Sequence, residues 1–261
     1  MFAGTVGYYR QYRPGIPTEV ADILNAAVAS AKPRRLLDIG TGTGLVAEAL
    51  IDRFDDIIAI DNDSQMLAAA EQTLRPKLSE GSQLSLIEST AEGFTPTPGW
   101  RAHLVTICRA FHWLDQPAVL ERLVDQVEPG GAVAIFGDSS FWAATSPWKS
   151  AVRQVIQDFL GEQRRAGQKT FSHHDRPYSD ILAESAFRHV EEFHVPVQRT
   201  WSSESILGYL YSTSFASRDL FGDSLSDFEN TVKTMLAEHS DKDTFIEDNE
   251  FVIRIGRKEK P

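Results

Sequence analysis

The sequence predicts an α/β protein built on a doubly wound, Rossmann-like, mostly parallel sheet. Five short apolar runs alternate with segments of helical periodicity between residues 18 and 138. A glycine-rich turn at residues 40–44 follows the first of these runs. Strands that are apolar on both faces are typical of parallel sheets that helices cover on two sides. A chain of 261 residues is long enough for one large domain, or for one domain with a cap.

The first half of the chain supplies the alternating elements in order. The strands are expected at residues 36–39, 57–60, 84–87, 103–108 and 132–136. The helices are expected at residues 18–33, 45–50, 66–74 and 119–127. A turn of sequence Glu-Pro-Gly-Gly at residues 128–131 precedes the fifth strand.

The alternation becomes irregular after residue 138, and the arm before residue 18 has no clear period. Residues 1–17 are rich in Tyr, Arg, Gly and Pro, and we expect an irregular arm there. The other elements expected are a loop with a long helix at 139–170, a helix at 178–187, a strand at 193–197, mostly helix at 203–239 and a last strand at 251–255.

Composition and charge exclude several classes of protein. The 37 acidic residues outnumber the 26 Lys and Arg residues, and the net charge of −11 disfavours nucleic acid and anionic membranes as partners. Cys108 is the only cysteine, so there is no intrachain disulfide, and we expect inert packing for it. No apolar run approaches the roughly 18 residues that span a bilayer, and the N-terminus lacks the apolar core of a signal peptide. We expect a soluble, cytoplasmic protein.

The most informative stretch is the run at residues 36–44, Leu-Leu-Asp-Ile-Gly-Thr-Gly-Thr-Gly. Glycines between a strand and a helix let the backbone approach a ligand closely, and the helix start offers unpaired N–H groups. Gly42, Gly44 and Ala47 match the dinucleotide pattern G-x-G-x-x-G/A, but that pattern alone is weak. The acid two residues before the first glycine, Asp38, favours S-adenosylmethionine instead. Its carboxylate can hold the cationic end of that cofactor and would repel a pyrophosphate. Asp61, which closes the second strand, can accept both hydroxyls of a ribose.

Further matches follow in chain order, with Ser-Thr-Ala-Glu at residues 89–92 and Glu-Pro-Gly-Gly at 128–131. Together with the glycine run and Asp61, they resemble the class I S-adenosylmethionine-dependent methyltransferases of the type 11 domain group. The resemblance covers most of residues 8–137 and returns weakly at 182–187. Residues 9–17 and the Ala-Phe-His-Trp-Leu-Asp segment at 110–115 resemble the small-molecule branch, which includes trans-aconitate methyltransferase-like proteins.

The resemblance implies a seven-stranded sheet in the order 3-2-1-4-5-7-6, with the last strand antiparallel. Ligands would lie beyond the C-terminal ends of strands 1, 2 and 4, at the topological switch point. We therefore expect a single methyltransferase domain over residues 1–261. Its expected parts are a lid arm at 1–17, a cofactor-binding core at 18–138, and helical segments over the substrate at 139–170 and 202–240.

The resemblance also implies the contacts of the cofactor, S-adenosyl-L-methionine. Three glycines line its methionine part, Asp61 takes the ribose, and Arg13 reaches the carboxylate. Adenine lies between Asn62 and Met66, with Thr90 and Ala91 at its edge. The complete expected set is Tyr12, Arg13, Asp38, Gly40, Thr41, Gly42, Gly44, Asp61, Asn62, Met66, Thr90, Ala91, Glu92 and Arg109. Two residues depart from the family pattern. Many relatives carry Asp at Thr90, and most carry a small residue at Arg109.

Two residues after the fourth strand are candidates for catalysis, Arg109 and His112. His112 is either a general base or a residue that packs with Trp113 against the sheet. Arg109 either holds a substrate carboxylate or pairs with a local acid such as Asp38. The run His-His-Asp at residues 173–175 has no third distant ligand, so we expect a loop there and no metal.

The implied reaction is an in-line attack of a substrate oxygen, nitrogen or carbon on the sulfonium methyl, with oxygen favoured. Bringing the reactants together and excluding water can supply several kcal/mol without an acid or a base. The long covering segments favour a small molecule as acceptor over a macromolecule. Two alternatives stay open, namely a nicotinamide-dependent oxidoreductase and a non-catalytic protein that binds S-adenosylmethionine.

Overall fold

The structure is a computed structural model that describes residues 4–28, 32–143, 146–163, 165–166, 169–170 and 176–259. The chain divides into two compact units. The sheet unit consists of Gly15–Asp138, His174–Val195 and Phe251–Pro261. The helical unit consists of Met1–Pro14, Ser139–His173 and Pro196–Glu250. That residues 1–17, 139–170 and 202–240 cover a substrate stays a prediction.

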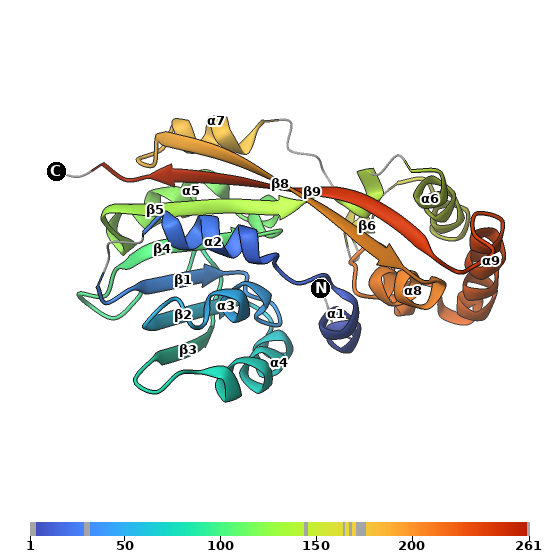
Figure 1. The fold of residues 1–261 in the computed structure, drawn as a ribbon, viewed down its shortest axis with the longest axis horizontal. Helices are drawn as coiled ribbons and strands as arrows, with labels where there is room; N and C mark the ends of the chain where they lie inside the picture. Colours follow the sequence, from blue (N-terminus) through green and yellow to red (C-terminus); the bar gives the residue numbers. More distant parts are fainter. Residues whose placement is uncertain are drawn as a thin grey trace. The chain divides into compact units, whose positions relative to one another are not determined.

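A seven-stranded sheet has the order β3-β2-β1-β4-β5-β9-β8 (Figure 1). Its strands are β1 (Arg35–Ile39), β2 (Asp56–Asp61), β3 (Gln83–Glu88), β4 (Ala102–Cys108), β5 (Val127–Asp138), β8 (His189–Trp201) and β9 (Phe245–Arg257). Strands β1 to β5 are parallel, and β9 runs antiparallel to β5. Because β8 and β9 are the sixth and seventh strands of this sheet, the predicted α/β fold and the strand order 3-2-1-4-5-7-6 are confirmed.

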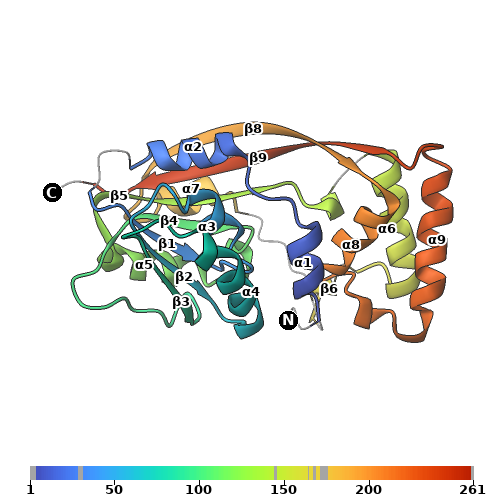
Figure 2. The same cartoon turned by 60° about the horizontal axis from the view of Figure 1, so that its bottom comes forward.

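The sheet is apolar on both faces because helices cover both. Helices α2 (Thr18–Ala26), α3 (Leu45–Leu50) and α4 (Ser64–Leu74) lie on one face, and α5 (Gln116–Gln126) and α7 (Tyr178–Ala183) lie on the other (Figures 1 and 2). At the centre of the sheet, Leu37 is paired in register with Ile58 of β2 and Val105 of β4. All three are buried. Burial on both faces explains why the strands read as continuous apolar runs.

Several element boundaries differ from the expected ones. Helix α5 begins at Gln116, three residues early, because the Asp115 carboxylate accepts the Ala118 N–H and caps it. Helix α2 ends at Ala26 and α7 at Ala183, so both helices are shorter than expected. The expected turn at 128–131 is part of β5, whose pairing with β4 shifts in register between Ala102 and Leu104.

The helical unit has its own core. The helices of this unit are α1 (Val6–Tyr12), α6 (Pro147–Leu160), α8 (Ser203–Tyr211) and α9 (Leu225–Ala237). Aromatic side chains make up about half of the core, and Phe221 and Phe228 stack with their ring centroids 3.9 Å apart. Residues 165–166 and 169–170 form a small antiparallel pair, β6 and β7, inside the expected 139–170 loop and helix. Strands β8 and β9 contribute residues to both units and extend well beyond the expected 193–197 and 251–255.

The N-terminal arm is not irregular as expected, because Val6–Tyr12 form helix α1. Its aromatic side chains pack on α8, where Gly208 leaves room for the Tyr12 ring. A Cβ atom at position 208 would lie only 2.5 Å from Tyr12 Cγ. The arm has few aliphatic residues, and for this reason the sequence did not indicate a packed helix. Aromatic contacts hold helix α1 in place instead.

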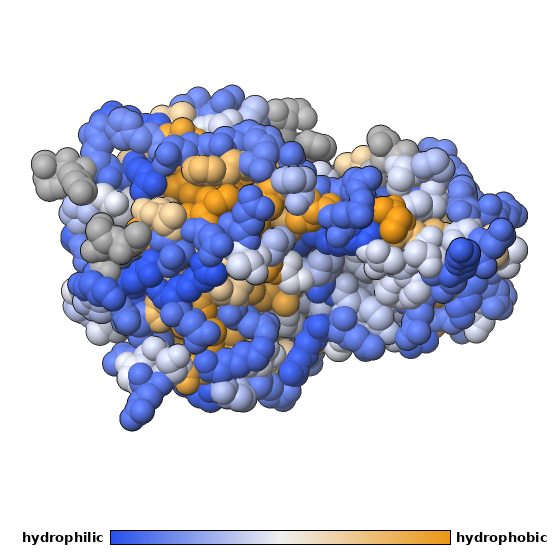
Figure 3. Space-filling model, viewed as in Figure 1, coloured by the Kyte–Doolittle hydropathy of each residue, from blue (hydrophilic) through white to orange (hydrophobic). Residues whose placement is uncertain are grey.

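The surface visible in Figure 3 is largely polar, in keeping with the net charge of −11. An apolar area lies over the part of the sheet unit where Figure 1 draws β8 and β9. Over the described ranges, no helix combines the length and the apolar character that crossing a membrane requires.

Candidate cofactor site

The glycine turn lies at the C-terminal end of β1, and its backbone conformation requires glycine. Gly40, Gly42 and Gly44 have φ values of +68°, +56° and +88°. The Gly40 N–H donates to Ile60 O (2.9 Å), which fixes the turn against the end of β2. A Cβ atom at Gly40 would come within 2.8 Å of the Ala110 Cβ. Side chains at these positions would strain the backbone and fill the space beside the turn.

Asp61 closes β2 and holds the glycine turn through hydrogen bonds to its own carboxylate. Oδ2 accepts the Gly42 N–H (2.8 Å), and Oδ1 accepts the Asp63 N–H (3.0 Å). Burial raises the pKa of Asp61, and these N–H donors oppose that rise. The backbone N–H of Asn62 also favours the anion. An ionised carboxylate has about four acceptor positions, so these donors leave capacity for a ligand hydroxyl.

Asp38 is the most buried acid of the site, with an exposed fraction of 1%. Its Oδ1 accepts the Thr106 hydroxyl (2.7 Å), whereas its Oδ2 has no hydrogen-bond partner in the described part of the chain. Burial raises the pKa of Asp38 to about 6, and the hydroxyls of Thr41 and Thr106 oppose the rise. A buried carboxylate oxygen without a donor is costly. A cationic donor from a ligand would satisfy it, and this fits the amine of S-adenosylmethionine.

The segment after β3 uses its side chains in local turns. Thr90 Oγ1 accepts the Gly93 N–H (3.0 Å), and Glu92 Oε1 accepts the Asp115 N–H at the start of α5 (3.0 Å). The Thr90 hydroxyl accepts this bond and keeps its own proton as a donor, and its contact with adenine stays a prediction.

The other expected adenine contacts differ in accessibility. Ala91 is largely buried and Met66 is buried in the first turn of α4, whereas Asn62 is exposed. Asp63 caps α4 by accepting the Gln65 and Met66 N–H groups. Asn62 follows the C-terminal end of β2, and Met66 lies in the helix that comes next. The contacts of these residues with adenine stay a prediction.

Arg109 at the end of β4 has a local acid as its partner. Its Nε donates to Asp138 Oδ1 (2.6 Å), and its guanidinium lies 5.2 Å from the Phe251 ring centroid. We expected Arg109 to bind either a substrate carboxylate or a local acid such as Asp38. In the structure it pairs with a local acid, and this acid is Asp138 of β5. Arg109 also has a φ of +54°, which is unusual for a residue with a side chain. Its predicted roles toward the cofactor and the substrate stay predictions.

His112 lies in a short 3₁₀ helix, Phe111–Trp113, directly after β4. The rings of His112 and Trp113 are 4.6 Å apart between centroids. Trp113 is 39% exposed, and Phe111 occupies the buried position of the segment. Packing of His112 with Trp113 against the sheet stays a prediction. The Trp113 ring forms part of the surroundings of His112. The role of His112 as a general base stays a prediction.

Tyr12 and Arg13 belong to the helical unit, where they bind α8. The Tyr12 hydroxyl donates to Glu204 Oε1 (3.3 Å). The Arg13 guanidinium lies 4.9 Å from the Tyr9 ring centroid and 4.8 Å from that of Tyr209. The predicted contact of Arg13 with the cofactor carboxylate stays a prediction.

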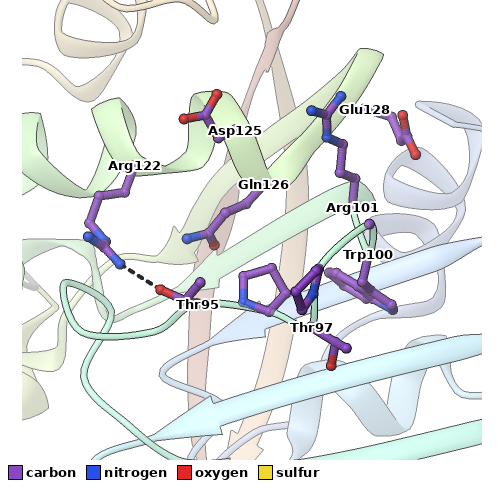
Figure 4. Close-up of a pocket in the computed structure, with 11 residues that line it drawn as sticks. Thr95, Thr97, Trp100, Arg101, Arg122, Asp125, Gln126 and Glu128 are labelled. Atoms are coloured by element: carbon purple, nitrogen blue, oxygen red, sulfur yellow. Dashed lines mark hydrogen bonds between the residues drawn. The ribbon is translucent and has the colours of Figure 1, made fainter.

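A separate groove of about 540 Å³ lies at the opposite edge of the sheet, near the starts of β4 and β5 (Figure 4). Arg122 of α5 donates to Thr95 Oγ1 across it (3.1 Å). None of the predicted site residues lines this groove. Within the described ranges no group of three or more His, Cys, Asp or Glu side chains could hold a metal ion. Residues 173–175 lie outside the described residues.

Sequence reasoning missed two site residues, Thr106 and Asp138. Both carry a signal in hindsight. Thr106 is a polar residue inside the apolar fourth strand, and Asp138 is the acid that ends the fifth. Neither partner could be assigned without the register of the sheet, which places Thr106 beside Asp38.

Comparisons with known proteins agree with this site. Residues 36–131 match the family model described as a methyltransferase domain. An uncharacterized methyltransferase of Mycobacterium tuberculosis is 32% identical over 134 residues, which cover 51% of this chain and 50% of that protein. Trans-aconitate 2-methyltransferase of Rhizobium leguminosarum bv. trifolii is 31% identical over 147 residues, which cover 51% of this chain and 54% of that protein. The chain thus matches about half the length of these curated relatives.

The fold comparison covers more of the chain. The solved structure of a type II methyltransferase from Anaeromyxobacter dehalogenans has a TM-score of 0.61 and 18% identity, over 96% of this chain and all of that one. This likeness supports the fold. The resemblance to class I S-adenosylmethionine-dependent methyltransferases is confirmed by the family match over residues 36–131 and by the relatives named as methyltransferases. The match supports S-adenosyl-L-methionine as the cofactor.

Proposed function

We propose that this protein transfers a methyl group from S-adenosyl-L-methionine to a small-molecule acceptor, with oxygen favoured over nitrogen or carbon. The observation that carries the proposal is the buried Asp38 Oδ2 beside the glycine turn, because it offers an acceptor that a ligand cation would satisfy. When bound, the cofactor supplies a methyl group made electrophilic by the sulfonium.

The residues of the sheet unit would divide the binding tasks. Asp38 takes the amine, the glycine turn lets the backbone approach the methionine part, and Asp61 accepts the ribose hydroxyls. Holding both reactants in a fixed geometry removes the entropic cost of their meeting, and this supplies several kcal/mol. Exclusion of water strengthens these electrostatic contacts further.

A carboxylic acid is the acceptor that we favour. The supporting comparisons are relatives named trans-aconitate 2-methyltransferase and malonyl-[acyl-carrier protein] O-methyltransferase, and both names denote carboxylic acids. The second relative is 25% identical over 71% of this chain. A carboxylate is already ionised at neutral pH, so its oxygen can attack without first losing a proton.

The proposal is tested by measuring S-adenosylhomocysteine formation with matched panels of small carboxylic acids, alcohols and amines. We expect turnover with at least one carboxylic acid and formation of its methyl ester. Asp61→Ala serves as the control for background hydrolysis of the cofactor. Binding of the cofactor without turnover on any panel would favour the non-catalytic alternative. No observation of the structure favours the nicotinamide-dependent oxidoreductase.

His112→Gln separates a general base from a residue that shapes the pocket. With a carboxylic acid acceptor no proton has to leave, so we expect the variant to keep kcat within about threefold across pH 6–9. With an alcohol or amine acceptor, a base is useful, and the variant should lose about 100-fold or more in kcat. The pH profile of kcat, recorded for each acceptor class, decides between the two roles.

A further inference from the structure

The buried polar residue Thr106 has no part in the function as proposed so far. It lies within β4, an otherwise apolar strand, and its side chain has an exposed fraction of 0%. The register of the sheet places it directly beside Asp38 of β1. Its hydroxyl donates to Asp38 Oδ1 at 2.7 Å. A hydroxyl at this depth needs a partner, and the carboxylate provides it.

Because of this hydrogen bond, the two oxygens of the Asp38 carboxylate have different surroundings. Oδ1 is occupied by Thr106, whereas Oδ2 is buried without a partner in the described residues. The bond therefore fixes the rotation of the carboxyl group and leaves Oδ2 as the oxygen to receive a ligand donor. A hydroxyl that donates to a carboxylate also stabilises its ionised form.

Burial and one neighbouring carboxylate oppose the ionised form of Asp38, and two hydroxyl groups favour it. The Asp61 carboxylate at the end of β2 acts against ionisation, as burial does. The hydroxyl of Thr41, in the glycine turn, acts in favour of it, as Thr106 does from β4. Arg109, directly after β4, is paired with Asp138. The groups that favour the Asp38 anion are thus neutral hydroxyls.

We infer that Thr106 is a positioning residue for cofactor binding, which holds Asp38 ionised and aims its Oδ2 at the cationic amine of the ligand. The inference rests on the proposed function, because it assumes that Asp38 meets this amine. It makes the affinity for an amine-bearing ligand depend on pH. Since the pKa of Asp38 is raised to about 6, the anion and the affinity are present above that pH and are lost as the pH falls through it.

The test measures the affinity for S-adenosylhomocysteine by calorimetry from pH 5 to 7.5, where the amine of this probe stays protonated. The plot of log Kd against pH bends at the pKa of Asp38 in the unliganded protein. In Thr106→Val, which keeps the shape and removes the hydroxyl, we expect the bend to move up by about one pH unit. Thr106→Ser should restore the wild-type bend. Thr231→Val is the matched control, since that hydroxyl donates to the Asp227 carbonyl in α9.

A second probe, 5′-methylthioadenosine, lacks the amino-acid end and distinguishes positioning from a purely structural role. Its affinity, and the change of that affinity with pH, should be nearly equal in wild type and Thr106→Val. Equal loss for both probes, or an unmoved bend for S-adenosylhomocysteine, would overturn the inference. If Thr106→Val does not fold, Thr106→Ala removes the same hydroxyl without adding a methyl group and is judged by the same bend. Failure of wild type to bind either probe would instead refute the proposed function.

Discussion

The Asp61 carboxylate has two tasks at the end of β2, and one of them is structural. Its oxygens accept the N–H groups of Gly42 and Asp63, so it fixes the glycine turn before any ligand binds. The motif predicts that an acid stands here but does not show that the acid holds the turn, because that bond depends on how two strand ends meet. Asp38 differs from Asp61, since the buried Oδ2 of Asp38 has no hydrogen-bond partner among the described residues.

Asp61→Ala should therefore reduce both affinity and stability. Loss of the ribose contacts should weaken S-adenosylhomocysteine binding by about 2–4 kcal/mol, or roughly 30-fold to 1000-fold. Loss of the acceptor for the Gly42 N–H should lower the free energy of unfolding by about 1–3 kcal/mol. Calorimetry and urea unfolding check the two effects, and Asp61→Asn, which keeps one acceptor oxygen, should lie between. Unchanged affinity in Asp61→Ala would remove this residue from the site.

The Arg109–Asp138 pair gives a second prediction at this scale. Arg109→Ala leaves the largely buried Asp138 without its cation, and we expect a loss of about 3–5 kcal/mol in the free energy of unfolding. Arg109→Ala combined with Asp138→Ala should recover a large part of that loss, since no charge is then left buried. The strain of a side chain at φ +54° is present in both variants and cancels in the comparison. Urea unfolding measures the stability of both variants. Equal stability of the single and the double variant would show that the loss does not come from an unpaired Asp138.

Among the elements, helix α1 shows where aromatic contacts replace an aliphatic core. Tyr8 packs edge to face on Tyr211 of α8, with ring centroids 5.2 Å apart, and the Tyr8 hydroxyl accepts a hydrogen bond from Arg218 (2.8 Å). Helix α1 is thus docked within the helical unit. Its predicted ordering over bound cofactor stays a prediction.

Gly208→Ala should undock α1. The added Cβ would meet the Tyr12 ring, and overpacking of this kind costs about 1–3 kcal/mol, although alanine favours the helix by about 1 kcal/mol. We expect faster hydrogen exchange in residues 6–12 and a lower melting temperature. Gly7→Ala is the matched control, because a Cβ there meets nothing within 4 Å, and it should stabilise the protein slightly. Unchanged exchange in Gly208→Ala would show that the two helices do not depend on this contact.

For the molecule as a whole, the sequence predicts the parallel half of the sheet well. Strands β1 to β5 are apolar because both faces are buried, and the glycine run marks the end of β1 without ambiguity. The long strands β8 and β9 could not be bounded from the sequence, because polar residues alternate with apolar ones along their exposed stretches. Side-chain partners such as Thr106 for Asp38 depend on register, which no local pattern fixes.

A ligand-induced shift in melting temperature shows whether residues 36–131 form a binding site for S-adenosylmethionine. A ligand that binds only the native state stabilises it by RT ln(1 + [L]/Kd), which is about 2.7 kcal/mol at 100 times Kd. We predict that saturating S-adenosylhomocysteine raises the melting temperature by several degrees, whereas NADH at the same concentration leaves it unchanged. A shift with NADH and none with S-adenosylhomocysteine would show that the site does not bind S-adenosylmethionine.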